Sequence, residues 1–309
     1  MEPMRTYTQV LVIGLLIVLP VNLRGQPHEG EKGDVNNDGT VNLTDVLKVV
    51  NYMLNIDDFN DQEFWRADCN SPVGRCSGDS SVNIFDVIKI VNLVLEVDLC
   101  PIGDTDGNIY RVIKIGNQWW MAENLKVTHY RSGDAIPNVT DNTEWANLTT
   151  GAYCNYNNDA GNVATYGRLY NWYAVDDSRN IAPSGWHVPT DAEWKQLEMS
   201  LGMSQSEADD TGWRGTNEGS KLAGNASLWA SGDLENNPEF GTSGFTALPG
   251  GCRLFSGYSY YLGIHALFWS APEHSSGYAW YRSLSCYYAQ VYRGSYGKVH
   301  GLSVRCVRD

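Results

Sequence analysis

The stretch GDVNNDGTVNLTDV, residues 33–46, decides the fold of the first third of the chain. Oxygen-bearing side chains occupy positions 1, 3, 5, 9 and 12 of a loop: Asp34, Asn36, Asp38, Asn42 and Asp45. Thr40 offers its backbone carbonyl at position 7, and Gly39 permits the sharp turn. Oxygens at this spacing are typical calcium ligands, so the loop predicts a calcium site. Asp45 replaces the usual glutamate, which either draws the next helix closer or gives up bidentate contact.

The same pattern returns 41 residues further along the chain. DGTVNLTDVLKVVNYML aligns with DSSVNIFDVIKIVNLVL, which places Asp79, Ser81, Asn83 and Asp86 at positions 5, 7, 9 and 12 of a second loop. After each final Asp, apolar residues follow helical spacing: Val46, Leu47, Val49, Val50, Met53 and Leu54, then Val87, Ile88, Val91, Val94 and Leu95. Each repeat is therefore predicted to be a loop followed by an amphipathic helix, and the two helices can pack together.

The first half of the second loop departs from the pattern. Arg75 and Ser77 stand at positions 1 and 3 counted back from Asp79, and neither is an anionic ligand. Asp68 and Asn70 supply these ligands if the residues between Asn70 and Asp79 form an inserted bulge. Because a serine also replaces the turn glycine, we expect two calcium ions, with the second site weaker than the first.

Residues 33–100 resemble a type I dockerin module in these features: the duplicated loop that ends in Asp, the Val-Asn pair at positions 8 and 9, and the single helix after each loop. The resemblance implies a small all-α fold with EF-hand-like loops around two calcium ions. It also implies a partner, the cohesin domain of a scaffold or surface protein. In that family positions 10 and 11 contact the partner, here Leu43, Thr44, Ile84 and Phe85. Packing of Ile84 and Phe85 within the module is the alternative.

The N-terminal sequence MEPMRTYTQVLVIGLLIVLPVNLRGQP is typical of a cleaved signal peptide. Arg5 precedes an apolar run at 10–19, and Pro20 and the small Gly25 follow. We predict a signal peptide at 1–25 and a linker at 26–32. An uncleaved anchor is the alternative, although the run is short for a bilayer. The protein is thus expected to be secreted, without a membrane span after cleavage, or held at the cell surface through the dockerin.

Charge and cysteine content narrow the function further. A net charge of -14 argues against nucleic acid, which requires clustered Lys and Arg. The seven cysteines of the exported chain favour disulfides, with one left unpaired, and their spacing does not match a zinc site. Cys69 and Cys76 bracket the bulge of the second loop and would close it. Cys154, Cys252, Cys286 and Cys306 allow three pairings, of which we prefer Cys252 with Cys286.

A second domain begins after a linker at 101–103, where Pro101 and Gly103 end the last helix. DTDGNIYRVIKIGNQWWMAENL predicts two strands joined by a turn at 116–117. PTDAEWKQLEMSLG predicts a helix capped by Thr190 and Glu193. With many short strands and Gly, Asn and Ser turns elsewhere, the sequence predicts an α+β domain. Acidic residues at 104–108 allow a third ion site, but a DG turn is the preferred interpretation.

Six sequence blocks run in order through residues 104–309: IGNQWWMAENLKVTHYRSGDAIPNV, GAYCNYNND, YGRLYNWYAV, PSGWHVPTDAEWKQLE, GFTALPGG and GLSVRCVRD. Together they resemble the Fibrobacter succinogenes major paralogous domain. The resemblance implies a fold similar to formylglycine-generating enzymes and to the C-type lectin superfamily. It implies no established molecular function.

No catalytic constellation is identifiable in this domain. His187 is interpreted as a packed structural histidine rather than a catalytic one, and nothing pairs the available carboxylates Glu144, Glu193, Glu235 and Glu239 as acid/base catalysis requires. Cys286 and Cys306 lack the spacing of a formylglycine-generating site. Tyr258, Tyr260 and Tyr261 lie in a Gly-Ser-rich loop and could stack on sugar rings, which makes carbohydrate binding a stronger alternative than catalysis, but a protein or surface ligand is preferred to a sugar.

The hypothesis is a secreted calcium-dependent adaptor. Its dockerin binds a cohesin-bearing protein, and its lectin-like domain binds a polysaccharide, protein or surface ligand. The alternatives are a dockerin-tethered enzyme of polysaccharide degradation, of the O-glycosyl hydrolase type, and a carbohydrate-binding module.

Overall fold

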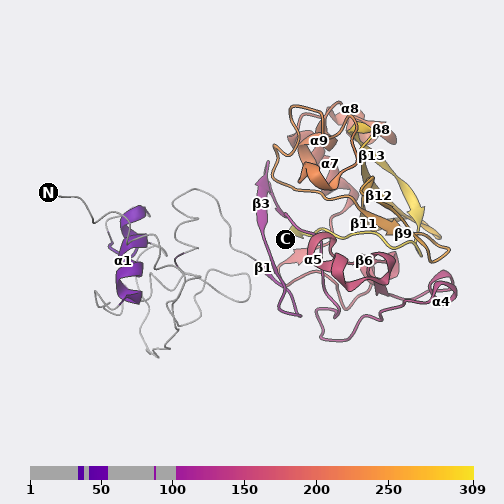
Figure 1. The fold of residues 1–309 in the computed structure, drawn as a ribbon, viewed down its shortest axis with the longest axis horizontal. Coiled ribbons are helices and arrows are strands. Elements are labelled where there is room, and N and C mark those ends of the chain that lie inside the picture. Colours follow the sequence, from indigo (N-terminus) through magenta and orange to yellow (C-terminus); the bar gives the residue numbers. More distant parts are fainter. Residues whose placement is uncertain (1–33, 38–41, 55–86, 88–101) are drawn as a thin grey trace. The chain divides into compact units, whose positions relative to one another are not determined.

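The computed structural model in Figure 1 describes residues 34–37, 42–54, 87 and 102–309. The chain divides into two compact units, residues 1–100 and 101–309, and each is described by itself. The predicted signal peptide, the linker at 26–32 and the Cys69–Cys76 disulfide lie outside the described residues. Within the part that the structure describes, no helix is both long and apolar enough to cross a membrane.

Helix α1 (Leu43–Met53) follows the first loop, as its sequence predicts. The Asn42 side chain accepts a hydrogen bond from the Thr44 backbone N–H, and the Asp45 carboxylate accepts one from the backbone N–H of Asn42. This reciprocal capping satisfies amide groups that have no partner within the helix. Val46 and Val49 are buried, whereas Leu47 of the predicted apolar face is exposed.

A four-stranded sheet joins the two ends of the second unit. Its strand order is β3 (Val112–Ile115), β4 (Gln118–Met121), β14 (Val307–Arg308) and β7 (Trp186–His187). The pairing of Ile115 with Gln118 confirms the hairpin predicted at residues 116–117. The last strand, β14, lies between β4 and β7 and is antiparallel to both. The C-terminal strand thus joins the β3–β4 hairpin to β7 in one sheet.

A six-stranded sheet forms the larger layer (Figure 1). Its strand order is β10 (Ser259–Leu262), β9 (Gly250–Arg253), β11 (His265–Ser275), β12 (Tyr278–Ser285), β13 (Tyr288–Gly297) and β8 (Gly212–Arg214). Strands β11, β12 and β13 form an antiparallel meander, and β9 pairs with β11 in parallel.

Shorter elements complete the unit. Two further strand pairs are β1 (Ile102–Gly103) with β2 (Ile109–Tyr110), and β5 (Tyr153–Cys154) with β6 (Leu169–Tyr170). The helices are α4 (Asn142–Ala146), α5 (Val163–Tyr166), α6 (Trp172–Val175), α7 (Asp191–Ser200), α8 (Gln205–Asp209) and α9 (Glu218–Leu222), with 3-10 turns η2 (Tyr156–Asn158), η3 (Ala160–Asn162) and η4 (Ala226–Leu228). Thr190 and Glu193 cap α7 as predicted, and the sheet-rich α+β class is confirmed.

Strand β11 separates two hydrophobic clusters. Because side chains alternate along a strand, Leu267 and Trp269 enter one cluster while Ala266 and Phe268 enter the other. The second cluster contains a set of aromatic rings whose neighbouring centroids lie 4.9–5.9 Å apart: Trp120, Trp194, Phe245 and Phe268. These rings link α7 and the hairpin β3–β4 to the six-stranded sheet.

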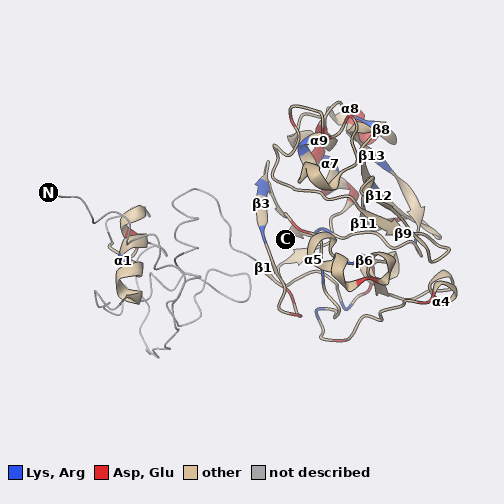
Figure 2. Ribbon diagram, in the orientation of Figure 1, with Lys and Arg blue, Asp and Glu red and all other residues tan. Residues whose placement is uncertain are grey.

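A buried ionic network fixes α7 to the same face of the sheet. The Glu198 carboxylate is fully buried and accepts two hydrogen bonds from Arg214, at 2.8 and 3.0 Å, and one from Arg282, at 2.7 Å. Asp191 accepts from Arg282 at 2.9 Å and from Arg293 at 2.8 Å. Figure 2 shows acidic and basic residues side by side in this corner of the domain, around α8 and β8.

The cysteines of the second unit correct one prediction. Cys154, Cys252, Cys286 and Cys306 are free and buried, so the expected Cys252–Cys286 disulfide is absent from the described residues. Cys252 packs in the cluster of Trp269, whereas Cys286 packs in the cluster of Phe268 on the other face of β11. Burial raises the pKa of Cys252 to about 12, which keeps its thiol protonated and a poor nucleophile.

Replacing Glu198 by Gln is expected to destabilise the domain by about 3–5 kcal/mol, because it leaves buried arginine charge without its carboxylate partner. Urea unfolding of the full chain measures this loss. Glu144→Gln, at an exposed glutamate, is the matched control and should change the unfolding free energy by less than about 0.5 kcal/mol. Equal unfolding free energies of the two variants would show that the ionic network does not stabilise the domain.

Candidate functional site

The loop that leads into α1 is the first candidate site. Asp34 and Asp45, at positions 1 and 12, are both buried, with exposures of 4% and 0%. The Asp45 carboxylate accepts hydrogen bonds from the backbone N–H groups of Asn36 at 3.0 Å and of Asn42 at 2.9 Å. The carboxylate at position 12 thus holds positions 3 and 9 close to itself, as a loop around one ion requires.

The donor chemistry of this loop fits calcium. Asp34 and Asp45 place two carboxylates out of water within one short loop, and buried charges of one sign require compensation by a cation or by hydrogen bonds. Asn36 and Asn42 add amide groups, and hard cations such as calcium prefer oxygen ligands. These four residues would hold the ion, and calcium would in turn draw the two ends of the loop together at the start of α1.

Other predicted ligands lie outside the described residues: Asp38, Thr40, Asp68, Asn70, Asp79, Ser81, Asn83 and Asp86. Among the residues that are described, no group of three or more His, Cys, Asp or Glu side chains is arranged to hold a metal ion. The described part of the first loop contributes two carboxylates, and its third, Asp38, belongs to the undescribed part. The binding of one calcium ion in each of the two loops therefore stays a prediction.

The predicted partner-binding residues of the first repeat are accessible. Leu43 is 62% exposed, and Thr44 is also exposed beside it at the start of α1. Leu47, one helical turn further, is 56% exposed and extends the same apolar stripe. Ile84 and Phe85 lie outside the described residues. The sequence pattern placed Leu47 on the packed face of the helix. Helical spacing alone cannot show which apolar side chains a second helix covers.

Asp45→Asn is expected to weaken calcium binding by about tenfold or more, because it removes a carboxylate charge from the loop. Calorimetric titration of calcium into the chelator-treated full chain measures the affinity and the number of ions. Asp210→Asn, at an exposed aspartate of the second unit, is the control and should bind calcium like the wild type. Unchanged titration of Asp45→Asn would remove this loop from the set of calcium sites.

The structure places His187 between two carboxylates. Its Nδ1 lies 2.7 Å from Asp309 Oδ1 and its Nε2 lies 2.8 Å from Glu193 Oε1, so both ring nitrogens are engaged. Partial burial favours the neutral ring, but the hydrogen bonds and charges of the two carboxylates outweigh it and raise the pKa of His187 above its ordinary value. The ring ties the chain end to the first turn of α7, which supports the structural interpretation.

His187→Gln is expected to cost more stability at about pH 5.5 than at about pH 8.5. A histidine with a raised folded-state pKa stabilises fully below its unfolded value, 6.5, and loses this contribution as the pH rises through the folded value. Urea unfolding at the two pH values measures the difference. His274→Gln, at an exposed histidine that packs on Trp280, is the control and should show no such trend. A pH-independent cost would contradict the ion-pair role.

The other polar candidates have structural partners. Asp104 accepts hydrogen bonds from the backbone N–H groups of Asp106 and Asn108 and from the Tyr110 hydroxyl, which is the pattern of a closed turn. Glu235 accepts from the backbone N–H of Gly232. Glu144 and Glu239 are exposed.

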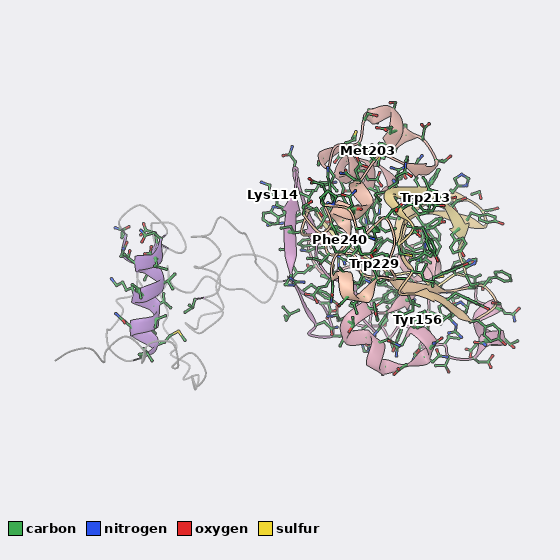
Figure 3. All side chains as sticks on the ribbon, turned by 45° about the horizontal axis from the view of Figure 1, so that its top comes forward. Lys114, Tyr156, Met203, Trp213, Trp229 and Phe240 are labelled. Atoms are coloured by element: carbon green, nitrogen blue, oxygen red, sulfur yellow. The ribbon has the colours of Figure 1, made fainter. Side chains whose placement is uncertain are left out.

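A second candidate site is a row of aromatic rings on the six-stranded sheet, which we call the aromatic surface. It comprises Trp213 on β8, Tyr288, Tyr292 and Tyr296 on β13, and Tyr281 on β12 (Figure 3 labels Trp213). Ring centroids lie 4.5 Å apart for Trp213 and Tyr288, 5.2 Å for Trp213 and Tyr292, 5.7 Å for Tyr292 and Tyr281, and 5.1 Å for Tyr281 and Tyr296. The rings are half-buried except Tyr288, which is exposed.

The two faces of these strands differ in chemistry. Directly opposed residues share a face, so Tyr292 lies on the face of Trp213, whereas Arg282 and Arg293 lie together on the opposite face with α7. Burial raises the pKa of Tyr281 and of Tyr296, so both phenols remain neutral. The ionic network thus occupies one face, and neutral aromatic groups occupy the other.

The tyrosines predicted to bind sugar lie on or beside β10, at the other edge of the sheet from β8. Tyr258, Tyr260 and Tyr261 are exposed, and the Tyr261 ring lies 4.9 Å from that of His265 on β11. Sequence reasoning missed Tyr292 and Tyr296. Their signal is the spacing of Tyr288, Tyr292 and Tyr296 in YAQVYRGSY, four residues apart, which puts all three side chains on one face of a strand.

Comparison with known families supports both units. The model of the Fibrobacter succinogenes major domain matches residues 113–308, which is more than half of the chain, and the chain therefore belongs to this family. The model of the dockerin type I domain matches residues 32–71, so the chain carries a dockerin ahead of that domain. Neither a curated protein nor a solved structure matches the chain significantly.

The dockerin carries general consequences. Type I dockerin domains bind Ca²⁺, and a dockerin implies attachment to a cohesin. Proteins that contain dockerins are generally extracellular or associated with the cell surface. The match ends at residue 71 and so includes the first loop and the proposed start of the second, Asp68 and Asn70.

Proposed function

We propose that the protein is a secreted adaptor, in which the calcium-loaded dockerin docks to a cohesin and the second domain binds a ligand at the attachment site. The observation that carries the proposal is the first loop, where buried Asp45 joins three ligand positions at the start of α1. Two calcium ions, one per loop, and a signal peptide at 1–25 belong to the proposal.

Calcium and docking are coupled through α1 in this scheme. The Asp45 carboxylate, a proposed calcium ligand, also caps α1. The exposed Leu43 and Thr44 are the two residues directly before Asp45 in the first turn of this helix. Ion binding would therefore order the same turn that presents these side chains to a partner. An apolar leucine exposed to water contributes to affinity when a partner covers it.

The second domain acts as a binding module in this proposal. A lectin-like or formylglycine-generating-enzyme-like fold is part of it, supported by the compact sheet-rich architecture. The buried, protonated cysteines and the doubly engaged His187 leave no activated nucleophile or free base among the predicted candidates. Binding by the aromatic surface is the role that the described residues support best.

Immobilised type I cohesin domains are expected to retain the full chain in calcium and to release it in chelator. Leu43→Asp should reduce retention by about tenfold or more, because it places a charge in an apolar contact. Ile109→Asp, the same change at a residue of the second unit that is 59% exposed, is the matched control and should be retained normally. Retention that ignores both calcium and Leu43→Asp would overturn the docking proposal.

A further inference from the structure

The exposed apolar side chains of the second unit are almost all aromatic. Ile109 is the one aliphatic example among the described large hydrophobics of this unit. The others are Phe255, Tyr258, Tyr260, Tyr261, Tyr278, Tyr287 and Tyr288, with exposures of 43–60%. A contiguous apolar patch on a protein surface often marks a binding site, so the rings in this set that contact further rings are the candidates for one. All seven fall within residues 255–288, on or beside strands β10 to β13.

The aromatic surface connects to these exposed rings. The Tyr296 ring stacks on His300 with centroids 3.9 Å apart, and His300 contacts Phe255 at 5.7 Å. At the other end, exposed Tyr288 packs on Trp213. Seven rings therefore form a chain of neighbouring contacts, five of them on β13, β12 and β8 and two, Phe255 and His300, beside these strands, with an exposed ring at each end.

The backbone of Tyr261 is strained beside this row. Its φ is +70°, in the left-handed region that bulky side chains rarely occupy. Gly251, on the paired strand β9, also has a positive φ, of 63°. The Tyr261 ring lies 4.9 Å from that of His265, on the strand next to β12. Strain of this kind persists where the surrounding structure imposes it, and it is concentrated at functional sites.

On strands β8, β12 and β13 the face that carries the rings has no charged side chain, although the acidic Glu207 and Asp210 lie beside Trp213 and Gln290 at the edge of the sheet. Ser283 lies directly opposite Tyr292, and Gln290 lies on the same strand two residues before it. At the far end Glu273 is neutralised by Lys298, with 2.6 Å between Oε2 and Nζ.

We propose that the aromatic surface, with Tyr261 at its side, binds a neutral polysaccharide chain. The proposal rests on the binding role of the second domain stated above and names its ligand class. Aromatic rings pack against the C–H faces of pyranose rings, while tyrosine and glutamine groups accept and donate hydrogen bonds to sugar hydroxyls. A row of rings across three strands suits an extended polymer rather than a single sugar.

Charge decides between ligand classes. An acidic polysaccharide needs cationic partners, but the arginines of β8, β12 and β13 pair with Glu198 and Asp191 on the opposite face. Protein interfaces combine aromatic residues with Arg and Met and often use charge for recognition. On strands β8, β12 and β13 the aromatic surface carries no Arg, no Met and no other charged residue. A neutral, hydroxyl-rich chain therefore fits it best.

Affinity electrophoresis of the full chain in native gels containing hydroxyethylcellulose, xyloglucan or glucomannan tests the proposal, with polygalacturonate as the acidic comparison. At least one neutral polymer is expected to retard the wild type, and polygalacturonate is not. Tyr292→Ala should weaken the retardation by about tenfold or more, since a central ring of a binding row carries a large share of the affinity. Tyr292→Phe, which keeps the ring, should retain most of it.

Tyr261→Gly provides a variant in which loss of fold is not the explanation for lost binding. Glycine accepts a positive φ without strain, so the unfolding midpoint should stay equal or rise while retardation falls. Tyr287→Ala, at a tyrosine that is 57% exposed and belongs to neither the ring row nor the Tyr261 contact, is the matched control and should bind like the wild type.

Three results would overturn the glycan assignment: no retardation by any of the three neutral polymers, retardation unaffected by both Tyr292→Ala and Tyr261→Gly, or equal loss in Tyr287→Ala. Cohesin retention in calcium is measured on the same preparations. Cohesin binding without polysaccharide binding would reject the ligand class alone, whereas loss of both would reject the adaptor proposal as well.

Discussion

The pairing of Glu198 with Arg214 and Arg282 is the interaction on which the second domain depends. It lies in the interior, where an unpaired charge costs several kcal/mol, so each partner requires the other. Through it, α7 is held against one face of β8, β12 and β13. The arginine side chains of these strands lie on that face, and the three strands carry no charged residue on the opposite face.

This segregation links folding to recognition. Side chains alternate across a strand, so the same segment supplies Arg282 and Arg293 to the ionic network and Tyr281 and Tyr292 to the aromatic surface. A rigid sheet anchored from behind presents the rings in a fixed row. The fixed geometry lowers the ordering cost of binding, which favours even weak contacts with a repetitive polymer.

The dockerin is stabilised in a different way from the second domain. A module of this size buries a small core, and metal ligation supplements it by adding binding free energy to folding. Asp45 links metal ligation to folding, because its carboxylate both holds the loop and caps α1. An extracellular location, where dockerin proteins generally act, provides the calcium that such a fold requires.

The sequence by itself determined the features that depend on neighbours along the chain. The calcium loop, the capped helices after residues 42 and 190, the hairpin at 116–117 and both families follow from short motifs, because turn and capping chemistry acts over a few residues. Tertiary structure alone decided where each cysteine of the second domain is buried, which carboxylates His187 contacts, and which tyrosines share a face. Cys252 and Cys286 fall on opposite sides of β11, and Asp309 reaches His187 from the chain end, 122 residues away. Such contacts arise from the packing of whole strands and helices, and no local spacing in the sequence encodes them.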